Sequence, residues 1–396
     1  MIRHLLKLVW NRKRANALIV AEIFVSFLVI FAVLTGAVTY GAKWREPLGF
    51  SWQNVWVVSM EFGEAPGVRE SPETHATVVR MLDELRAMPQ VAAAGVASTP
   101  PYSFSNSESS QEIDGRTVSY TFDEVTDGYY DAMQLKLLSG RWFNASDDGA
   151  QAQPIVVDSN TAREIFQTEE AVGKKFEPAE GTFFQVVGVV APFRKDGEAT
   201  ADMKMLFRRT ARDTSQGRIG SDLVIRLHPG TPAVFEQQLV GRLQQIAPSL
   251  SFRVRAMSQM RQNMMRAKLS PLIAGGIVGT FLIAMVTLGL TGVLWQNVTR
   301  RTREIGLRRA MGATGSNVHR QVLGDVALLA TFALVIGSVV VLQLPIIGAF
   351  TYVTPSAFTT GFICALATIY ALTVLCGLYP SWLASRLQPA DALRYE

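Results

Sequence analysis

Residues 23–42 read IFVSFLVIFAVLTGAVTYGA, a run of twenty residues without a charged side chain. Two more uncharged runs follow, at 269–299 and 326–385. A membrane-spanning helix needs about 20 predominantly apolar residues, so the first two runs each hold one helix and the third is long enough for two. Prolines and a glycine between 345 and 355 interrupt the third run. The sequence therefore predicts four transmembrane helices, at 15–42, 269–299, 325–347 and 357–384.

Basic residues indicate on which side of the membrane each connecting segment lies. Residues 1–14 contain five basic residues and no acid, residues 300–325 contain six arginines and two acids, and residues 43–268 are net acidic. Lys and Arg are enriched in short cytoplasmic segments. We therefore expect a membrane protein whose termini, loop 300–324 and tail 385–396 are cytoplasmic, and whose large insertion lies outside the cytoplasm. No nucleic-acid partner is expected, because the basic residues are not gathered on a folded domain.

The 43–268 insertion is long enough to form a domain with its own core. Its two ends share a strand–helix–strand pattern. At the first end the expected strands are 55–60 and 91–97, with a helix opened by Ser71 and Pro72; at the second they are 223–227 and a strand around Phe252, with a helix opened by Thr231 and Pro232. The fold class predicted is thus an α-helical membrane protein with a large α+β extracytoplasmic domain. One lobe would be built from 43–104 and 221–268, and a β-rich lobe from 105–220.

The sequence shows no motif for nucleotide binding, metal binding or catalysis. The sequence contains no G-x-x-x-x-G-K-[ST] loop to hold ATP phosphates. The four histidines, at positions 4, 75, 228 and 319, lack the spacing of metal ligands. The carboxylate pairs at 147–148 and 169–170 lie in turn-like sequence, so we expect them to be solvated. The chain is therefore predicted to carry no catalytic residue, no metal site and no cofactor of its own.

Three features lie in or beside the membrane helices. Four apolar residues of 1–14 share one helical face, which predicts an amphipathic helix against the lipid of the cytoplasmic surface. Glu22 lies inside the apolar region of the first helix. Such a carboxylate either faces other helices and is functional or extends toward the interface, and both readings stay open. Gly275 and Gly279 form a small-xxx-small pair, which favours close helix contact.

The most specific pattern follows the second membrane helix, where residues 300–314 read RRTREIGLRRAMGAT. This stretch resembles the R-x-x-E-I-G-x-x-[RK]-A-x-G-A pattern of the MacB/FtsX-type permeases, the type VII or mechanotransmission group of ABC transporters. Every defined position is matched, by Arg301, Glu304, Ile305, Gly306, Arg309, Ala310, Gly312 and Ala313. The proline and the Ala-Leu-Arg of the chain end, residues 380 and 392–394, also resemble that family, as does the four-helix layout.

The resemblance implies a location in the bacterial inner membrane, with the insertion 43–268 in the periplasm. It also implies a mechanism and partners. In this family the cytoplasmic loop forms a coupling helix that docks on an ATPase subunit, which binds ATP and Mg. Two permeases, identical or paralogous, sit on an ATPase dimer, and the first two membrane helices carry motion to a porter-like lobe and an inserted β-rich lobe. A periplasmic adaptor is a further partner that the family allows. Some members carry the ATPase ahead of the permease on one chain; here the first helix begins near residue 15, so a separate ATPase subunit is expected.

Three functions of this fold stay open. The first is efflux of a hydrophobic or peptide substrate, which the size of the external domain favours. The second is extraction of lipidated proteins by a lipoprotein-release permease. The third is a regulatory permease that transports nothing and activates a periplasmic partner, although the external domain of that branch is usually smaller.

Overall fold

A computed structural model describes residues 13–63, 67–113, 115–179, 181–198, 200, 203–210, 219–300, 315–348 and 353–385. The chain divides into two compact units. The membrane unit combines Met1–Ala42 with Leu269–Glu396, and the external unit is Lys43–Lys268. The chain therefore passes between the units at two links, between residues 42 and 43 and between residues 268 and 269.

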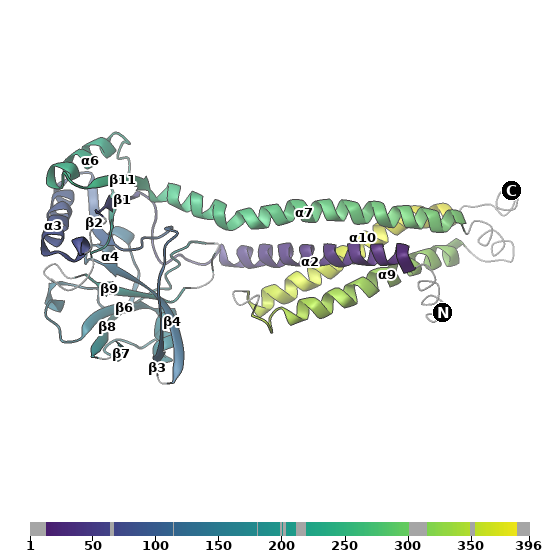
Figure 1. The fold of residues 1–396 in the computed structure, drawn as a ribbon, viewed down its shortest axis with the longest axis horizontal. Coiled ribbons are helices and arrows are strands. Elements are labelled where there is room, and N and C mark those ends of the chain that lie inside the picture. Colours follow the sequence, from purple (N-terminus) through teal and green to yellow (C-terminus); the bar gives the residue numbers. More distant parts are fainter. Residues whose placement is uncertain are drawn as a thin grey trace. The chain divides into compact units, whose positions relative to one another are not determined.

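The membrane unit is built from long apolar helices (Figure 1). They are α2 (Lys13–Lys43), α7 (Met257–Arg300), α9 (Gly315–Gln343) and α10 (Pro355–Ser385). Each contains a stretch long and apolar enough to cross a membrane, so the structure describes four candidate spans. This confirms the predicted class of membrane protein with four apolar helices.

The helix ends differ from the expected spans in three places. Helix α9 begins at Gly315, ten residues before the expected start at 325, so the last part of the expected loop 300–324 is helical. Helix α7 begins at Met257, well before residue 269, and continues through Pro271. Its first turns place Met257, Met260 and Met264 on one face, and all three are buried in the core of the external unit. Helix α9 ends at Gln343, because the chain turns there through Gly348, whose φ of +73° favours glycine.

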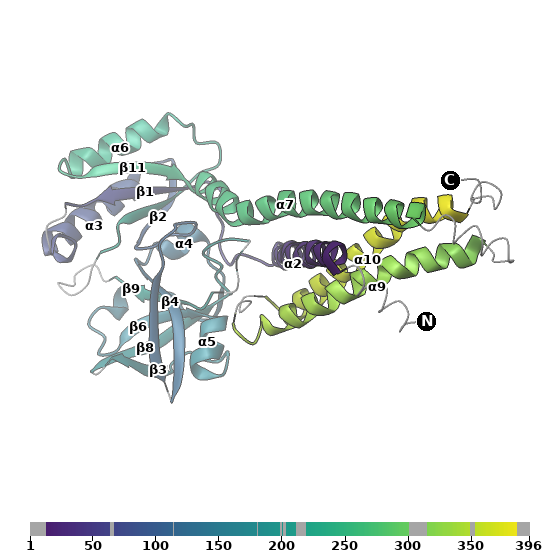
Figure 2. The same cartoon turned by 45° about the vertical axis from the view of Figure 1, so that its right-hand side comes forward.

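Helix α2 contacts each of the other three membrane helices, which lie alongside it in both views (Figures 1 and 2). A Cβ added to Gly337 of α9 would lie 2.6 Å from the ring of Phe27, and one added to Gly361 of α10 would lie 2.8 Å from the Cα of Thr35. The rings of Phe31 and Phe358 meet edge to face at 5.2 Å. Small residues thus let the helices approach closely, as membrane helices do where packing drives association.

The external unit is organised around one eleven-stranded mixed sheet in the order β11-β1-β10-β2-β4-β9-β6-β8-β5, with β3 on β4 and β7 on β8. The strands are β1 (Val55–Glu61), β2 (Val91–Ala97), β3 (Ser107–Ile113), β4 (Arg116–Val125), β5 (Leu137–Gly140), β6 (Gln153–Asp158), β7 (Lys175–Ala179), β8 (Thr182–Val190), β9 (Met205–Arg209), β10 (Asp222–Leu227) and β11 (Ser251–Ala256). The pairs β4–β9 and β6–β8 are parallel, and the other pairs are antiparallel. This mixed sheet matches the expected α+β class.

The sheet has two halves that follow the sequence. The first half, β11-β1-β10-β2, comes from the two ends of the insertion, and the second half, β3 to β9, comes from its middle. Among the described residues, the two halves pair through Ala97 and Val125. They are nevertheless not independent, because one hydrophobic cluster contains residues of both, including Val57 and Val224 from the first half and Val156 and Phe207 from the second.

The described residues of the external unit also form four helices and two 3-10 turns, and Figure 2 labels the helices. They are α3 (Pro72–Ala87), α4 (Tyr129–Met133), α5 (Ser159–Phe166), α6 (Phe235–Ile246), η1 (Val68–Glu70) and η2 (Ala145–Asp147). Helices α3 and α6 share a core with alternate residues of β10, Leu223 and Ile225, whereas Val224 between them joins the cluster that contains α4. This alternation is what period-two side-chain direction in a strand requires.

The starts of helices α3 and α6 can be compared with their predicted positions. The Ser71 hydroxyl caps α3 by accepting the N–H of Thr74 at 3.2 Å, as its sequence predicts. Helix α6, however, begins at Phe235, so the expected start at Thr231 is wrong. The Thr231 hydroxyl instead donates to the carbonyl of His228 at 2.7 Å, which closes a turn ahead of the helix.

Candidate functional site

The predicted ATPase-coupling residues Arg301, Glu304, Ile305, Gly306, Arg309, Ala310, Gly312 and Ala313 lie outside the described residues. The structure describes the helices on either side of them. Helix α7 ends at Arg300 and α9 begins at Gly315, so the motif connects two long helices. Residues 1–12, which hold most of the predicted amphipathic helix, also lie outside the described part.

Glu22 faces helix α7 from α2. Its Oε2 lies 2.9 Å from the point that a Cβ on Gly289 would occupy. The carboxylate is half-buried, and Ser26, one turn further along α2, is fully buried. Residue 289 therefore has room for this carboxylate only because it is glycine.

Gly275 and Gly279 lie at the same α2–α7 contact. A Cβ on Gly275 would lie 3.0 Å from Val33, and one on Gly279 would lie 3.8 Å from Val29. On the other helix, a Cβ on Gly36 would lie 3.1 Å from Leu272. The contacts advance along α7 as they retreat along α2, so the two helices pack antiparallel with small residues at their interface.

A polar site that sequence analysis missed lies in the external unit. It is centred on the loop 192–198, PFRKDGE, which we call the clasp loop. This loop follows β8, and four of its residues are charged: Arg194, Lys195, Asp196 and Glu198. Charged side chains are seldom buried unless they are paired. Arg194, Lys195 and Glu198 are all buried.

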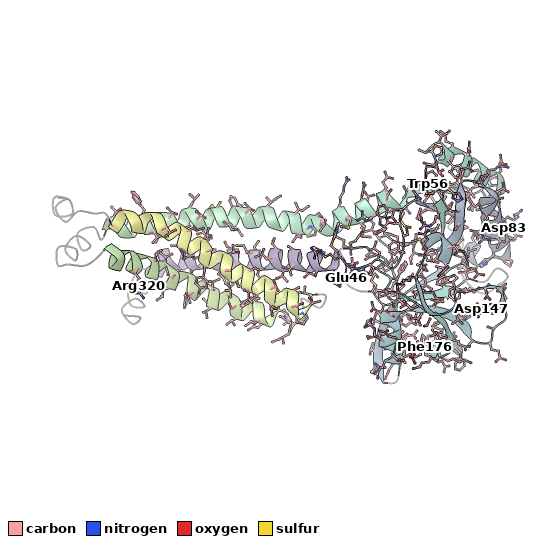
Figure 3. The ribbon with its side chains drawn as sticks, turned by 180° about the vertical axis from the view of Figure 1, so that it is seen from behind. Glu46, Trp56, Asp83, Asp147, Phe176 and Arg320 are labelled. Atoms are coloured by element: carbon pink, nitrogen blue, oxygen red, sulfur yellow. The ribbon has the colours of Figure 1, made fainter. Side chains whose placement is uncertain are left out.

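Arg194 holds the segment that leaves α2. Its side chain is 2% exposed, and its Nη1 donates to the carbonyls of Lys43 at 2.8 Å and Glu46 at 3.2 Å. Its Nη2 donates to the carbonyls of Glu198 at 2.9 Å and Thr200 at 3.1 Å. The Glu46 carboxylate lies 3.7 Å away (Figure 3 labels Glu46). One guanidinium thus cross-links the end of α2 to the clasp loop.

Two acids of the clasp loop hold the first turns of α7. Arg261 donates from Nε to Glu198 Oε1 at 2.8 Å, and its Nη2 lies 2.6 Å from the same oxygen. The Arg261 guanidinium also stacks over the ring of Trp52, 4.7 Å from its centroid. Lys268 Nζ lies 3.4 Å from Asp196 Oδ2. The clasp loop therefore contacts both links of the chain.

Lys195 points into the second half of the sheet. Its Nζ donates to the carbonyl of Ser105 at 2.5 Å and to Asn106 Oδ1 at 2.9 Å, just before β3. Burial lowers the pKa of this amine, and the nearby Asp123 opposes that effect. Burial in turn raises the pKa of Asp123 to about 7, although Lys195 and the backbone N–H groups of Thr99 and Ser98 oppose the rise.

Two glycines give the clasp loop its shape. Gly197 has a φ of +89°, and a Cβ there would lie 2.6 Å from the ring of Tyr102. Gly49 has a φ of +81°, and a Cβ there would lie 2.2 Å from the carbonyl oxygen of Pro192. Both positions combine left-handed backbone with a close approach, which a side chain would prevent.

The expectation that the acids of 147–148 are solvated is wrong for Asp147, whereas Asp148 is exposed. Asp147 is buried and accepts two hydrogen bonds from Arg141, at 2.5 and 2.7 Å, which lower its pKa. Asp148 pairs with the buried Arg209, which also binds Asp127 at 2.7 Å. These acids neutralise arginines that the local sequence does not reveal as their partners. No group of three or more His, Cys, Asp or Glu within the described residues could hold a metal ion.

These features define a polytopic membrane protein that carries a large mixed α/β domain between its first and second candidate spans. Comparison with protein families matches residues 24–241 to the MacB-like periplasmic core domain and residues 276–389 to the FtsX-like permease C-terminal domain. The first match alone covers more than half of the chain. The chain therefore belongs to the MacB/FtsX-type ABC transporter permeases, as the sequence resemblance indicated.

Individual relatives are distant. The macrolide export ATP-binding/permease protein MacB of Pasteurella multocida is 26% identical over 287 residues, which cover 71% of this chain and 44% of that protein. A probable syringafactin export ATP-binding/permease protein of Pseudomonas syringae is 24% identical, over 70% of this chain and 43% of that protein. The chain thus spans less than half the length of these curated relatives. The crystal structure of the periplasmic region of MacB from Actinobacillus actinomycetemcomitans matches 56% of this chain and 98% of that chain, at 16% identity and a TM-score of 0.38.

Proposed function

We propose that this chain is the permease subunit of an ABC exporter, in which ATP hydrolysis by a separate ATPase subunit moves the periplasmic domain. The observation that carries the proposal is the continuity of α7. This helix follows β11 directly, at Met257, and runs unbroken to Arg300, directly before the motif that begins at Arg301. A continuous helix is stiff along its axis, and α7 stays continuous although Pro271 removes one of its internal hydrogen bonds, so a displacement at the motif would reach the end of β11.

The motif at 301–313 supplies the proposed docking element. Glu304 can accept charge-assisted hydrogen bonds from a partner, and Gly306 and Gly312 permit close backbone approach. Ile305 and Ala310 provide an apolar stripe for a groove on the ATPase. The ATPase subunit would bind ATP and Mg, and a second permease, a copy of this chain or a paralogue, would complete the assembly.

The distribution of basic residues supports an orientation in the membrane, and the names of two relatives support a class of substrate. The basic residues of 1–14 and of 300–324 favour a cytoplasmic position for both termini and for the motif, in the inner membrane, with Lys43–Lys268 in the periplasm. Two relatives are named as exporters of macrolide and of syringafactin. We therefore propose efflux of a hydrophobic or peptide substrate, with a periplasmic adaptor as a further partner.

Purification from native membranes tests this function. The tagged chain should retain an ATPase subunit with a phosphate-binding loop, and the complex should hydrolyse ATP after reconstitution with lipid. Recovery of a lipidated protein as cargo would instead support the lipoprotein-release alternative. Recovery of a periplasmic hydrolase whose activity requires the permease would support the regulatory alternative.

A further inference from the structure

The clasp loop connects parts of the external unit that the backbone does not connect directly. Both links of the chain lead by covalent continuity into the first half of the sheet: residues 43–54 lead to β1, and β11 leads to α7. The second half of the sheet adjoins neither link in sequence. In the described residues it joins the first half through the Ala97–Val125 pair and through the hydrophobic cluster that the two halves share.

The clasp loop adds polar contacts between the second half of the sheet and both links. One link residue, Lys43, gives its carbonyl to Arg194, and the other, Lys268, places its amine 3.4 Å from Asp196. The loop itself continues β8 of the second half, and Lys195 adds a second attachment at Ser105, before β3. Thus a single short loop binds both links and is anchored at two places in the second half.

The chemistry of these contacts favours a stiff connection. Arg194 uses both terminal nitrogens on four carbonyl oxygens in a buried site. A buried charge that loses its partners is strongly unfavourable, so the Arg194 contacts resist separation. Glu198 is bound on both sides, through its carbonyl by Arg194 and through its carboxylate by Arg261.

We propose that Arg194, Asp196 and Glu198 are positioning residues that lock the two links together and make the second half of the sheet follow the movement of α2 and α7. This inference rests on the proposed function, because the movement it transmits is the one that ATP hydrolysis would drive. Without the clasp, the first half would still follow the links through the backbone, whereas the second half would be held only by the Ala97–Val125 pair and the shared hydrophobic cluster.

Distance measurements between spin labels test the proposal. In a chain whose Cys364 and Cys376 are replaced by alanine, one label at Arg45 marks the first link. A second label at Glu170 reports on the second half of the sheet, and at Gln237 it reports on the first. All three positions are exposed. The full chain in nanodiscs is measured first without nucleotide.

Arg194→Gln should broaden the 45–170 distance distribution more than the 45–237 distribution, because Arg194 also holds Lys43 and Glu46 on either side of the shared label. Lys268→Gln should broaden the 45–170 distribution less, since this amine is partly exposed and makes one of several contacts. If Arg194→Gln fails to fold, Lys268→Gln and Asp196→Asn decide the result. The matched control is Arg253→Gln, which breaks an exposed pair with Glu61 between β11 and β1 and should change neither distribution.

The complex with its ATPase supplies the second readout. The clasp variants should retain the ATPase and hydrolyse ATP as the unaltered complex does, while export per ATP falls about fivefold or more, the lower end of typical coupling between two sites. A 45–170 distribution that stays narrow in the folded clasp variants would overturn the inference. Failure of the unaltered chain to bind any ATPase would contradict the proposed function instead, and the distance measurement without nucleotide would still decide the role of the clasp.

Discussion

The carboxylate of Glu22 lies against Gly289, with Oε2 only 2.9 Å from the position that a Cβ at residue 289 would take. A larger residue at 289 must displace this side chain, and overpacking of this kind costs about 1–3 kcal/mol. Gly289→Val should therefore lower the thermal stability of the protein in detergent. Gly292→Val is the matched control, because a Cβ at residue 292 meets no atom within 4 Å. Equal melting temperatures for the two variants would contradict the contact.

The same contact gives Glu22 a testable role. If its position against α7 serves coupling, Glu22→Ala should reduce transport-linked ATP hydrolysis without reducing expression. The measurement is ATP hydrolysis by the reconstituted complex with and without substrate. Substrate stimulation equal to that of the unaltered protein would show that the carboxylate merely extends toward the interface.

Two neighbouring glycines of α7 test the helix contact at its other end. A Cβ on Gly275 would lie 3.0 Å from Val33, whereas a Cβ on Gly276 would meet no atom within 4 Å. Gly275→Leu should separate α2 from α7 and lower the melting temperature, and Gly276→Leu should leave it nearly unchanged. The pairing of α2 with α7 is wrong if Gly276→Leu is the more damaging change.

The buried carboxyl of Asp123 predicts a pH dependence of stability. Burial raises its folded-state pKa to about 7, from an unfolded value of about 3.9, so the folded state binds this proton more tightly. The resulting stability is complete below about pH 4 and is lost as the pH rises to about 7, at about 1.4 kcal/mol per pH unit. Asp158, with a pKa raised by burial to about 6, acts in the same direction.

Thermal unfolding of the full chain from about pH 5 to about pH 8 measures this effect. The midpoint should fall as the pH rises, and Asp123→Asn should reduce the fall, since an amide oxygen can still accept the N–H groups of Ser98 and Thr99. Asp83→Asn, at an exposed carboxyl of α3, is the control. An unchanged pH dependence in Asp123→Asn would refute the assignment.

Sequence periodicity predicts the elements whose partners are local or apolar. The four uncharged or apolar stretches, β2 at Val91–Ala97 and the Ser71 cap all depend on composition, alternation or a hydrogen bond within three residues. The clasp does not follow from such patterns. Arg194 binds the carbonyl of Lys43, 151 residues earlier, and a run such as RKDGE has the composition of a solvated turn.

Two other differences between the predicted and the observed structure also arise from contacts that local sequence patterns do not reveal. Asp147 looked solvated because its partner, Arg141, binds it only once the chain has turned between them. The first turns of α7 looked like the end of the external domain because their three buried methionines face a core assembled from distant strands. In sequence, the clasp loop shows only a run of charged residues around Gly197 directly after a strand. Such a run is common in solvated turns, so it does not by itself predict the buried contacts.

Membrane topology is tested by limited proteolysis. A protease added outside spheroplasts should cut within Lys43–Lys268 and leave 300–324 intact, because positive charge favours the cytoplasmic side for the shorter segment. The fragments can be identified by mass spectrometry. Protection of the long segment together with cleavage of the short one would reverse the proposed orientation.

The coupling motif carries the central claim and can be altered without changing membrane insertion, since the remaining arginines still set orientation. Glu304→Lys reverses a charge whose shielded hydrogen bonds are each worth about 1.5–3 kcal/mol. Gly312→Leu adds bulk without charge at a position where the proposed docking needs close backbone approach. Thr302→Lys and Met311→Leu are the matched controls, because both residues occupy undefined positions of the motif.

The most direct measurement is retention of the ATPase subunit by each variant, together with ATP hydrolysis after reconstitution in lipid. Glu304→Lys and Gly312→Leu should each lose at least about tenfold in ATPase binding, which corresponds to about 1.4 kcal/mol, and both controls should bind as the unaltered chain does. If Glu304→Lys and Gly312→Leu instead hold the ATPase and support hydrolysis like the unaltered chain, the loop serves only to fix topology and the coupling account is wrong.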